Sequence, residues 1–205
     1  MTSSTIIDLI RQTAAGLRLL LALTVVLGVL YPVAVWALAQ PLGDRAAGQP
    51  LREDGRIVGS RLLGQQFDGD RWFQGRPSAN AYDSLASGPS NLGPSNLDLL
   101  TAIAERRTDV AAREGVDPAR VPADALTASG SGLDPHISAD YARLQAPRVA
   151  RENDLPLSLV EQFIAANTDH RPLGFLGEDG VNVVALNLDV DRARPATHPV
   201  DDGGD

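Results

Sequence analysis

Cysteine and lysine are both missing from this chain of 205 residues, and all eighteen of its basic residues are arginine. The absence of cysteine excludes disulfides and thiolate metal sites. The absence of lysine excludes a Schiff-base amine, a lysine general base and a P-loop lysine. The sequence contains no Walker A motif and can contain no Asp-Lys-Thr-Gly phosphorylation motif, so we do not expect it to hydrolyse ATP by itself.

Histidine is scarce as well, and the three that occur are widely separated: His136, His170 and His198. None stands in a metal-ligand spacing such as His-Glu-x-x-His. We therefore predict no metal site and no catalytic residue.

Acidic residues outnumber basic ones. Two arginines, Arg11 and Arg18, and one acidic residue, Asp8, precede residue 40, so the remainder of the chain carries a formal net charge of −9. This charge makes nucleic acid an unfavourable partner and weakly favours cations near the surface. The alternative reading is a solvated acidic surface that aids solubility.

One long apolar run, residues 19–39, contains no charge and only Thr24 as a strongly polar residue. As a helix it would span roughly 31 Å, which matches the hydrocarbon core of a bilayer. The sequence Ala37-Leu38-Ala39 has the form of a signal-peptidase site, so a cleaved signal peptide is the alternative. The run is longer than a signal core, and we therefore predict an uncleaved single membrane anchor.

The orientation of this anchor is not decided by counting arginines. Two lie on its amino side, and three lie on its carboxyl side, namely Arg45, Arg52 and Arg56. Because Arg18 adjoins the run and long domains translocate largely regardless of charge, we predict a cytoplasmic amino terminus and an extracytoplasmic domain.

The sequence divides into five predicted regions. These are a cytoplasmic tail at 1–18, a transmembrane anchor at 19–39, a linker at 40–56, a soluble domain at 57–192 and a disordered tail at 193–205. Helix and strand patterns are mixed without regular alternation, so the predicted fold class is α+β: one N-terminal transmembrane helix followed by a single mixed α/β soluble domain.

Within that domain, the periodicity and the turn residues predict individual elements. We expect a strand at Ile57-Val58 that pairs with 60–67 across Gly59, and a closing strand at 181–190. The expected helices run from Ser95 to Gly115, from Asp134-Pro135 to Gln145 with a break at Pro147, and through Leu159 to Asn167.

A glycine-rich turn contains the residues that invite a catalytic reading, Ser131, Asp134 and His136. Three residues so close in one turn rarely reach triad geometry, so local hydrogen bonding is favoured over catalysis. Backbone N–H groups at Ser129, Gly130, Ser131 and Gly132 offer a weak anion cradle. Gln145 has an amide of the kind that recognises adenine, although a surface or cap-bonding glutamine is the more common case.

Seven motifs occur in order along nearly the whole chain: GSRLLGQQF, GRPSA, SNLGPSN, VPADALTASGSGLDPHIS, QAPRVAREN, LGFLGE and VNVVALNLDVD. With the N-terminal anchor, they make the chain resemble the C subunit of the Kdp potassium-transporting ATPase. Pro89 departs from that family, which usually has a second glycine there. The resemblance implies a non-catalytic subunit of a high-affinity, ATP-driven potassium importer.

The resemblance also implies partners. These are a channel-like subunit that carries potassium and a P-type ATPase subunit that hydrolyses ATP, with a small single-span subunit as a further candidate and membrane lipid around the anchor. Proteins of this family are described as catalytic chaperones that raise the ATP affinity of the pump subunit, so no cofactor is expected to bind tightly and ATP would be met through the complex.

An external domain cannot touch cytoplasmic ATP, so the predicted orientation favours a cap over the potassium entrance instead. A signal-anchored external hydrolase that uses Ser131 and His136, and a secreted binding module, remain alternatives. The residues assigned to nucleotide are Gln145 and 129–132. Those assigned to subunit contact are Gly28, Ser90, Asn91, Gly93, Pro94, Asn96, Asp134 and His136.

Overall fold

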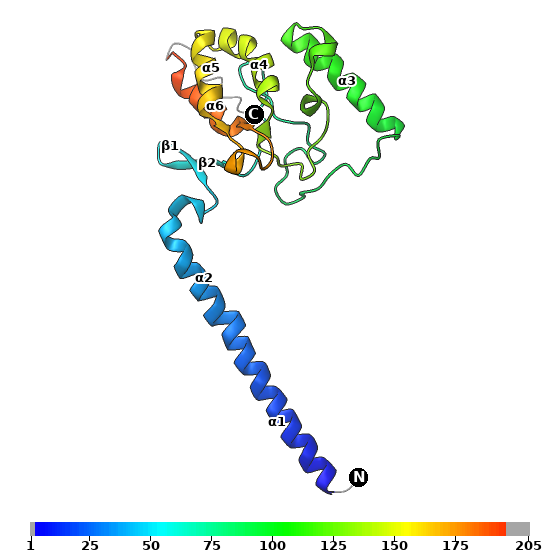
Figure 1. Cartoon of the computed structure of the whole chain (residues 1–205), viewed down its shortest axis with the longest axis vertical. Coiled ribbons are helices and arrows are strands. Elements are labelled where there is room, and N and C mark those ends of the chain that lie inside the picture. Colours follow the sequence, from blue (N-terminus) through cyan, green and yellow to red (C-terminus); the bar gives the residue numbers. More distant parts are fainter. Residues whose placement is uncertain (1–2, 196–205) are drawn as a thin grey trace, which may run out of the picture. The chain divides into compact units, whose positions relative to one another are not determined.

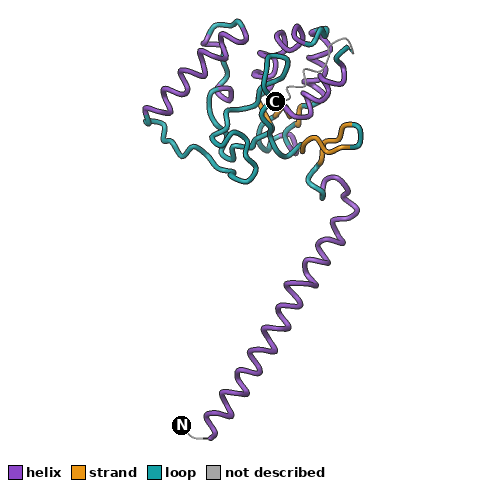
Figure 2. Tube along the Cα trace, turned by 180° about the vertical axis from the view of Figure 1, so that it is seen from behind, coloured by secondary structure: helices purple, strands orange, loops and turns teal. Residues whose placement is uncertain are grey.

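The computed structural model describes residues 3–195 and divides the chain into two units, Met1–Gly48 and Gln49–Asp205. The predicted disorder of the tail falls mostly on residues 196–205, which lie outside the described part. The backbone of each unit is drawn in Figures 1 and 2.

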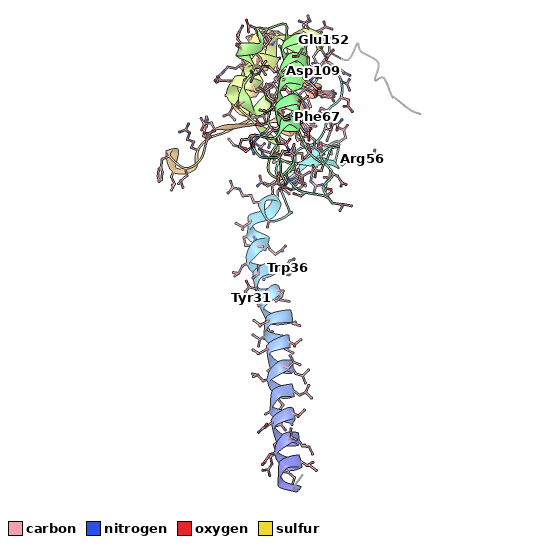
Figure 3. All side chains as sticks on the ribbon, turned by 90° about the vertical axis from the view of Figure 1, so that its right-hand side faces the viewer. Tyr31, Trp36, Arg56, Phe67, Asp109 and Glu152 are labelled. Carbon is pink, nitrogen blue, oxygen red and sulfur yellow. The ribbon has the colours of Figure 1, made fainter. Side chains whose placement is uncertain are left out.

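The first unit is a helical rod. It consists of α1 (Ser3–Val25), the π-helical turn η1 (Val26–Leu30), α2 (Tyr31–Ala39) and the 3-10 turn η2 (Gln40–Arg45). The predicted tail at 1–18 is therefore helical from residue 3 onward. The stretch Ile6–Arg45 is long and apolar enough to cross a membrane, and its most apolar window is wholly exposed. The side chains of Tyr31 and Trp36 project outward from it (Figure 3).

The π-turn has a local cause. Pro32 has no N–H to donate to the carbonyl of Gly28, and its ring crowds that carbonyl in a regular α-helix. The preceding N–H, that of Tyr31, bonds the carbonyl of Val26 five residues back, which widens the helix by one residue. A Cβ added at Gly28 would meet only Thr24, at 4.0 Å. Gly28 therefore leaves room on the helix surface.

The second unit begins with a hairpin of β1 (Pro50–Glu53) and β2 (Arg56–Ser60). Asp54 and Gly55 join the strands with φ values of 47° and 79°, as a two-residue hairpin turn requires. The predicted pairing of 57–58 with 60–67 is wrong, because β2 pairs backward with β1 and only an isolated bridge joins Ser60 to Leu63. The Asp-Gly pair inside the predicted linker is the signal that was missed.

A small antiparallel sheet lies at the centre of the second unit. Its strand order is β3 (His136–Ile137), β5 (Gly180–Asn182) and β4 (Thr168–Asp169). The predicted strand at 181–190 is wrong beyond its first two residues. From Val183 the chain forms a helix, because the buried residues Val183, Leu186, Asn187 and Val190 also satisfy a helical spacing.

Four helices accompany this sheet: α3 (Leu97–Glu114), α4 (Ala139–Glu152), α5 (Leu157–Ala166) and α6 (Val183–Ala193). Figure 1 shows α4, α5 and α6 gathered together, with most of α3 extending away from them. The C-terminal end of α3 contacts α4, where Glu114 pairs with Arg148. Short 3-10 turns η3 (Pro118–Arg120), η4 (Ala123–Ala125) and η5 (Pro172–Gly174) lie in the connections. The helix expected to end near Asn167 is confirmed as α5.

Two predicted helix boundaries need correction. The N-cap of α3 is Asn96 rather than Ser95, and its side chain accepts from the N–H groups of Asp98 and Leu99. Helix α4 starts after the N-cap Ser138, not at Asp134, and it continues through Pro147. Pro147 lies on the exposed face of α4 one turn after the exposed Arg143, so water can satisfy the carbonyl that proline leaves unpaired.

The core of the second unit is formed by the sheet, by helices α4 to α6 and by Val110 and Ala111 of α3. Its largest fully buried apolar side chains are Phe73, Ile137, Val149, Val160, Val181, Val184, Leu186 and Val190. Phe73 comes from a segment with no regular secondary structure, so something other than a sheet must hold that segment in place.

Candidate functional site

Side chains from two helices hold the irregular segment 70–74 by its backbone. Gln145 of α4 accepts from the N–H of Gln74 at 2.7 Å and donates to the Gln74 carbonyl at 3.1 Å. Asn187 of α6 does the same for Phe73, at 2.8 Å and 3.0 Å. Each amide thus supplies the two bonds that a neighbouring strand would supply.

Two further side chains complete this backbone clamp, which we define as Gln145, Arg148, Asn153 and Asn187. Arg148 donates to the carbonyls of Asp70 and Trp72, and Asn153 donates to that of Arg71 at 2.7 Å. The guanidinium of Arg148 is also paired with Glu114 at 3.0 Å, both side chains being at most 3% exposed. Burial of this pair and of the amides leaves the clamp without solvent access.

The clamp bears directly on the nucleotide prediction. Gln145 is 0% exposed, its Nε2 donates to Gln74, and its Oε1 accepts from both Gln74 and Arg148. An amide bound in this way presents no free edge to a base. The QAPRVAREN motif therefore has a structural role here, which sequence reasoning did not identify.

The glycine-rich turn is also largely bound within the protein. Ser129 donates its N–H to the carbonyl of Pro77 at 3.1 Å, and Gly132 donates to that of Ser129 at 3.3 Å. Gly130 and Ser131 are exposed, and the Ser131 hydroxyl accepts from the N–H of Leu133. Two of the four N–H groups expected to cradle an anion are thus already donated.

Asp134 and His136 are brought together, but Ser131 is not paired with them. A line of charged groups runs through this region: Arg76 lies 3.1 Å from Asp134, and Asp134 lies 3.7 Å from the His136 Nδ1. His136 Nε2 in turn lies 2.9 Å from Asp169, which is 3.4 Å from Arg61. The arrangement links the loop before β3 to β4 by ion pairs.

These contacts shift two pKa values. The hydrogen bond to Asp134 raises the pKa of His136, burial opposes that shift, and Asp169 adds to it. Burial acts to raise the pKa of Asp134, but hydrogen bonds from His136 and Arg76 outweigh it and the net shift is downward. Both shifts favour the ion pair.

A cavity of about 570 Å³ opens beside this line of charges. Carboxylates predominate among its polar lining residues: Asp124, Asp134, Asp169, Glu178 and Asp179, with Arg76, His136 and His170. Within residues 3–195, no three His, Asp or Glu side chains are grouped in a way that could hold a metal ion. The cavity is therefore an acidic surface hollow.

The tandem repeat at 88–97 forms an exposed connection. Residues 89–95 are all exposed, and Asn91 adopts a left-handed φ of 56°. Gly88 donates its N–H to the carbonyl of Ser131 at 2.9 Å, which ties the repeat to the glycine-rich turn. The residues Ser90, Asn91, Gly93 and Pro94 are thus on the surface, and Asn96 caps α3.

The fold and the surface together define a class: a chain with one N-terminal helix long and apolar enough to cross a membrane, followed by a mixed helix and strand domain with an acidic surface hollow. The model of the family "KdpC: K+-transporting ATPase, c chain" matches residues 13–192. The chain belongs to this family.

Curated relatives are similar over most of their length. A potassium-transporting ATPase KdpC subunit of Kineococcus radiotolerans is 53% identical over 190 residues, covering 92% of this chain and 97% of the relative. That of Mycobacterium bovis is 49% identical over 187 residues, covering 89% and 98%. That of Methylococcus capsulatus is 48% identical over 193 residues, covering 91% and 100%.

Proposed function

We propose that this chain is a non-catalytic accessory subunit of the potassium-uptake ATPase, anchored by its one apolar helix, with its second unit outside the cytoplasm near the potassium entrance. Its partners are the potassium-translocating subunit and the P-type ATPase subunit, with a small single-span subunit as a further candidate. Family membership supports the complex, and the chain's lack of lysine supports a non-catalytic role.

The observation that carries the choice of role is the bound state of Gln145. Both ends of its amide are bonded to Gln74 and its side chain is fully buried, so adenine recognition would require the clamp to open. The net charge of −9 after residue 39 favours cations instead. These two features support a cap that raises the local potassium concentration, with no direct contact to nucleotide.

A second role, raising the ATP affinity of the pump subunit, is compatible with the same fold only if it is transmitted through a partner. It requires coupling between distinct sites rather than a shared nucleotide pocket. The two roles separate in kinetics. A cap changes the potassium KM of uptake, whereas a chaperone changes the ATP KM of hydrolysis.

Orientation is tested by labelling with a membrane-impermeant thiol reagent, because the natural chain contains no cysteine to interfere. Ser131→Cys lies at an exposed position of the second unit, and Asp8→Cys lies at an exposed position before the apolar run. We expect the first variant to react in intact cells and the second only after lysis. The reverse pattern would place the second unit in the cytoplasm and remove the cap.

A further inference from the structure

The loop between β4 and β5 holds three apolar side chains in solvent. Leu173 is 81% exposed, Phe175 is 71% exposed and Leu176 is 49% exposed. Phe175 is the one exposed aromatic residue among the described residues of the second unit. Figure 3 shows this orange-tinted loop projecting from the body of that unit. Single exposed leucines are ordinary, but three apolar residues within four positions form a patch.

The backbone of this loop is built to keep the patch outward. Leu173 adopts a left-handed φ of 56°, and Gly174 and Gly177 adopt 78° and 77°. Leucine rarely occupies that region, because its Cβ crowds the following carbonyl. A Cβ added at either glycine would meet nothing within 4 Å, so the glycines serve the turn and not close packing. Strain of this kind is concentrated at functional positions.

The base of the loop is held by one carboxylate. Asp179 accepts from the N–H of Arg171 at 2.9 Å and lies 3.4 Å from the His170 Nδ1. Directly behind it, Asp169 of β4 pairs with Gly180 of β5. The apolar tip is therefore presented on a fixed stem, which lowers the entropy that docking would cost.

We propose that Leu173, Phe175 and Leu176, here called the apolar tip, insert into an apolar pocket with a cationic rim on another subunit of the potassium-transporting ATPase. This proposal rests on the proposed function, since it assumes the complex and gives the second unit its point of attachment. The tip would act as an anchor residue cluster of the type that dominates many interfaces.

Charge favours a protein pocket over the bilayer as the occupant. The stem carries Asp169, Glu178 and Asp179. Asp169 is paired with Arg61 and His136, and Asp179 is paired with Arg171 and His170. Three carboxylates against two arginines leave the stem weakly acidic, so anionic lipid headgroups would not attract it. The tip also lacks the tryptophan, tyrosine and basic residues that anchor loops at a membrane surface. Acidic residues around an apolar anchor are complementary to a pocket with arginine or lysine at its rim.

The test uses the whole complex purified in mild detergent through a tag on the pump subunit. The double variant Leu173→Ser/Phe175→Ser should reduce the amount of this chain that co-purifies at least tenfold. Leu85→Ser is the matched control, because Leu85 is 96% exposed elsewhere in the same unit and should leave recovery unchanged. Equal recovery of both variants would overturn the proposal.

Photo-cross-linking from benzoylphenylalanine substituted for Phe175 is a second test, and it does not depend on a loss of binding. A cross-link to another subunit in intact cells supports the proposal, while cross-links to lipid alone, or none, overturn it. The labelling of Ser131→Cys is independent of this result. If the apolar tip proves not to bind another subunit while Ser131→Cys is labelled in intact cells, the proposed orientation still holds. If Ser131→Cys is labelled only after lysis, the proposed orientation is wrong, whatever the tip experiments show.

Discussion

The side-chain amide of Gln145 forms a two-way hydrogen-bonded pair with the backbone of Gln74, with Nε2 donating at 3.1 Å and Oε1 accepting at 2.7 Å. Asn187 repeats the pair on the adjacent residue, Phe73. Two side chains thus replace a missing strand and allow an irregular segment to place Phe73, which is 0% exposed, in the core. Gln145, which the sequence analysis assigned to nucleotide binding, instead holds the backbone of Gln74 in place.

Replacing Gln145 by alanine should destabilise the second unit by about 2 to 4 kcal/mol. The change leaves the partly buried N–H and carbonyl of Gln74 without their partners and removes a buried acceptor from Arg148. Thermal unfolding of the full chain in mild detergent measures this. Gln66→Ala is the control, since Gln66 is exposed and bonds only the neighbouring Asp68, and its cost should be near zero. Unchanged stability of Gln145→Ala together with weakened ATP binding by the complex would instead support a nucleotide contact.

The buried ion pair of Glu114 and Arg148 should be far more costly to break than a surface pair of the same chemistry. Glu114→Ala leaves the Arg148 guanidinium buried and uncompensated, so we expect a loss of about 3 to 5 kcal/mol. Glu152 pairs with Arg151 at a similar distance of 3.1 Å, but both side chains are exposed to solvent. Glu152→Ala should cost less than about 1 kcal/mol, and equal losses in the two variants would contradict the assigned burial.

Much of the helical framework was predictable because it depends on local signals. Helix α5 followed from its apolar spacing, and α3 was placed to within two residues by its capping residues and by Gly115. Helix α6 was not, because the alternating residues of 181–190 fit both periods and only the N-cap Asn182 and the helix contacts decide between them. Pairings between distant residues left no local pattern.

In the candidate site too, contacts between residues near in sequence were predictable and contacts between distant residues were not. The proximity of Asp134 and His136 follows from their separation by a single residue in the sequence. The turn at 129–132 follows from its glycine and serine residues. The pair of Gln145 and Gln74 joins residues 71 positions apart, and the contact of His136 with Asp169 joins residues 33 apart. No periodicity or composition encodes such contacts. Leu173 was visible only as part of a family motif, since its exposure depends on the left-handed turn.

Protonation of His136 should stabilise the second unit. Its pKa is raised by Asp134 and Asp169, so the stabilisation is fully present below the unfolded value near 6.5 and is lost as the pH rises through the folded value. Since 35% of the His136 side chain is exposed, solvent screens the pair and the contribution stays below about 1 kcal/mol. Thermal unfolding between pH 6 and pH 8.5 should show a decline that is smaller in His136→Gln. An identical pH dependence in both proteins would rule out this histidine as its source.

Two glycines of the TASGSG turn should respond in opposite ways to alanine. Gly132 has a φ of 70°, and a Cβ there would collide with the side chain of Asn80. Asn80 cannot easily give way, because its Nδ2 donates to the carbonyls of Asp83 and Ala86. Gly132→Ala should therefore cost about 2 kcal/mol or more, the sum of backbone strain and a displaced hydrogen-bonded side chain.

Gly130, two residues earlier, is the matched control. It lacks a positive φ of this kind, and a Cβ there would meet nothing within 4 Å. Gly130→Ala should be neutral or slightly stabilising, because alanine restricts the unfolded chain more than glycine does. Thermal unfolding of both variants in detergent, with potassium uptake measured in parallel, distinguishes a loss of stability from a loss of contact with another subunit. Normal stability of Gly130→Ala with reduced uptake would mark the exposed part of this turn as a subunit contact, whereas normal stability of Gly132→Ala would contradict the packing of Asn80 described above.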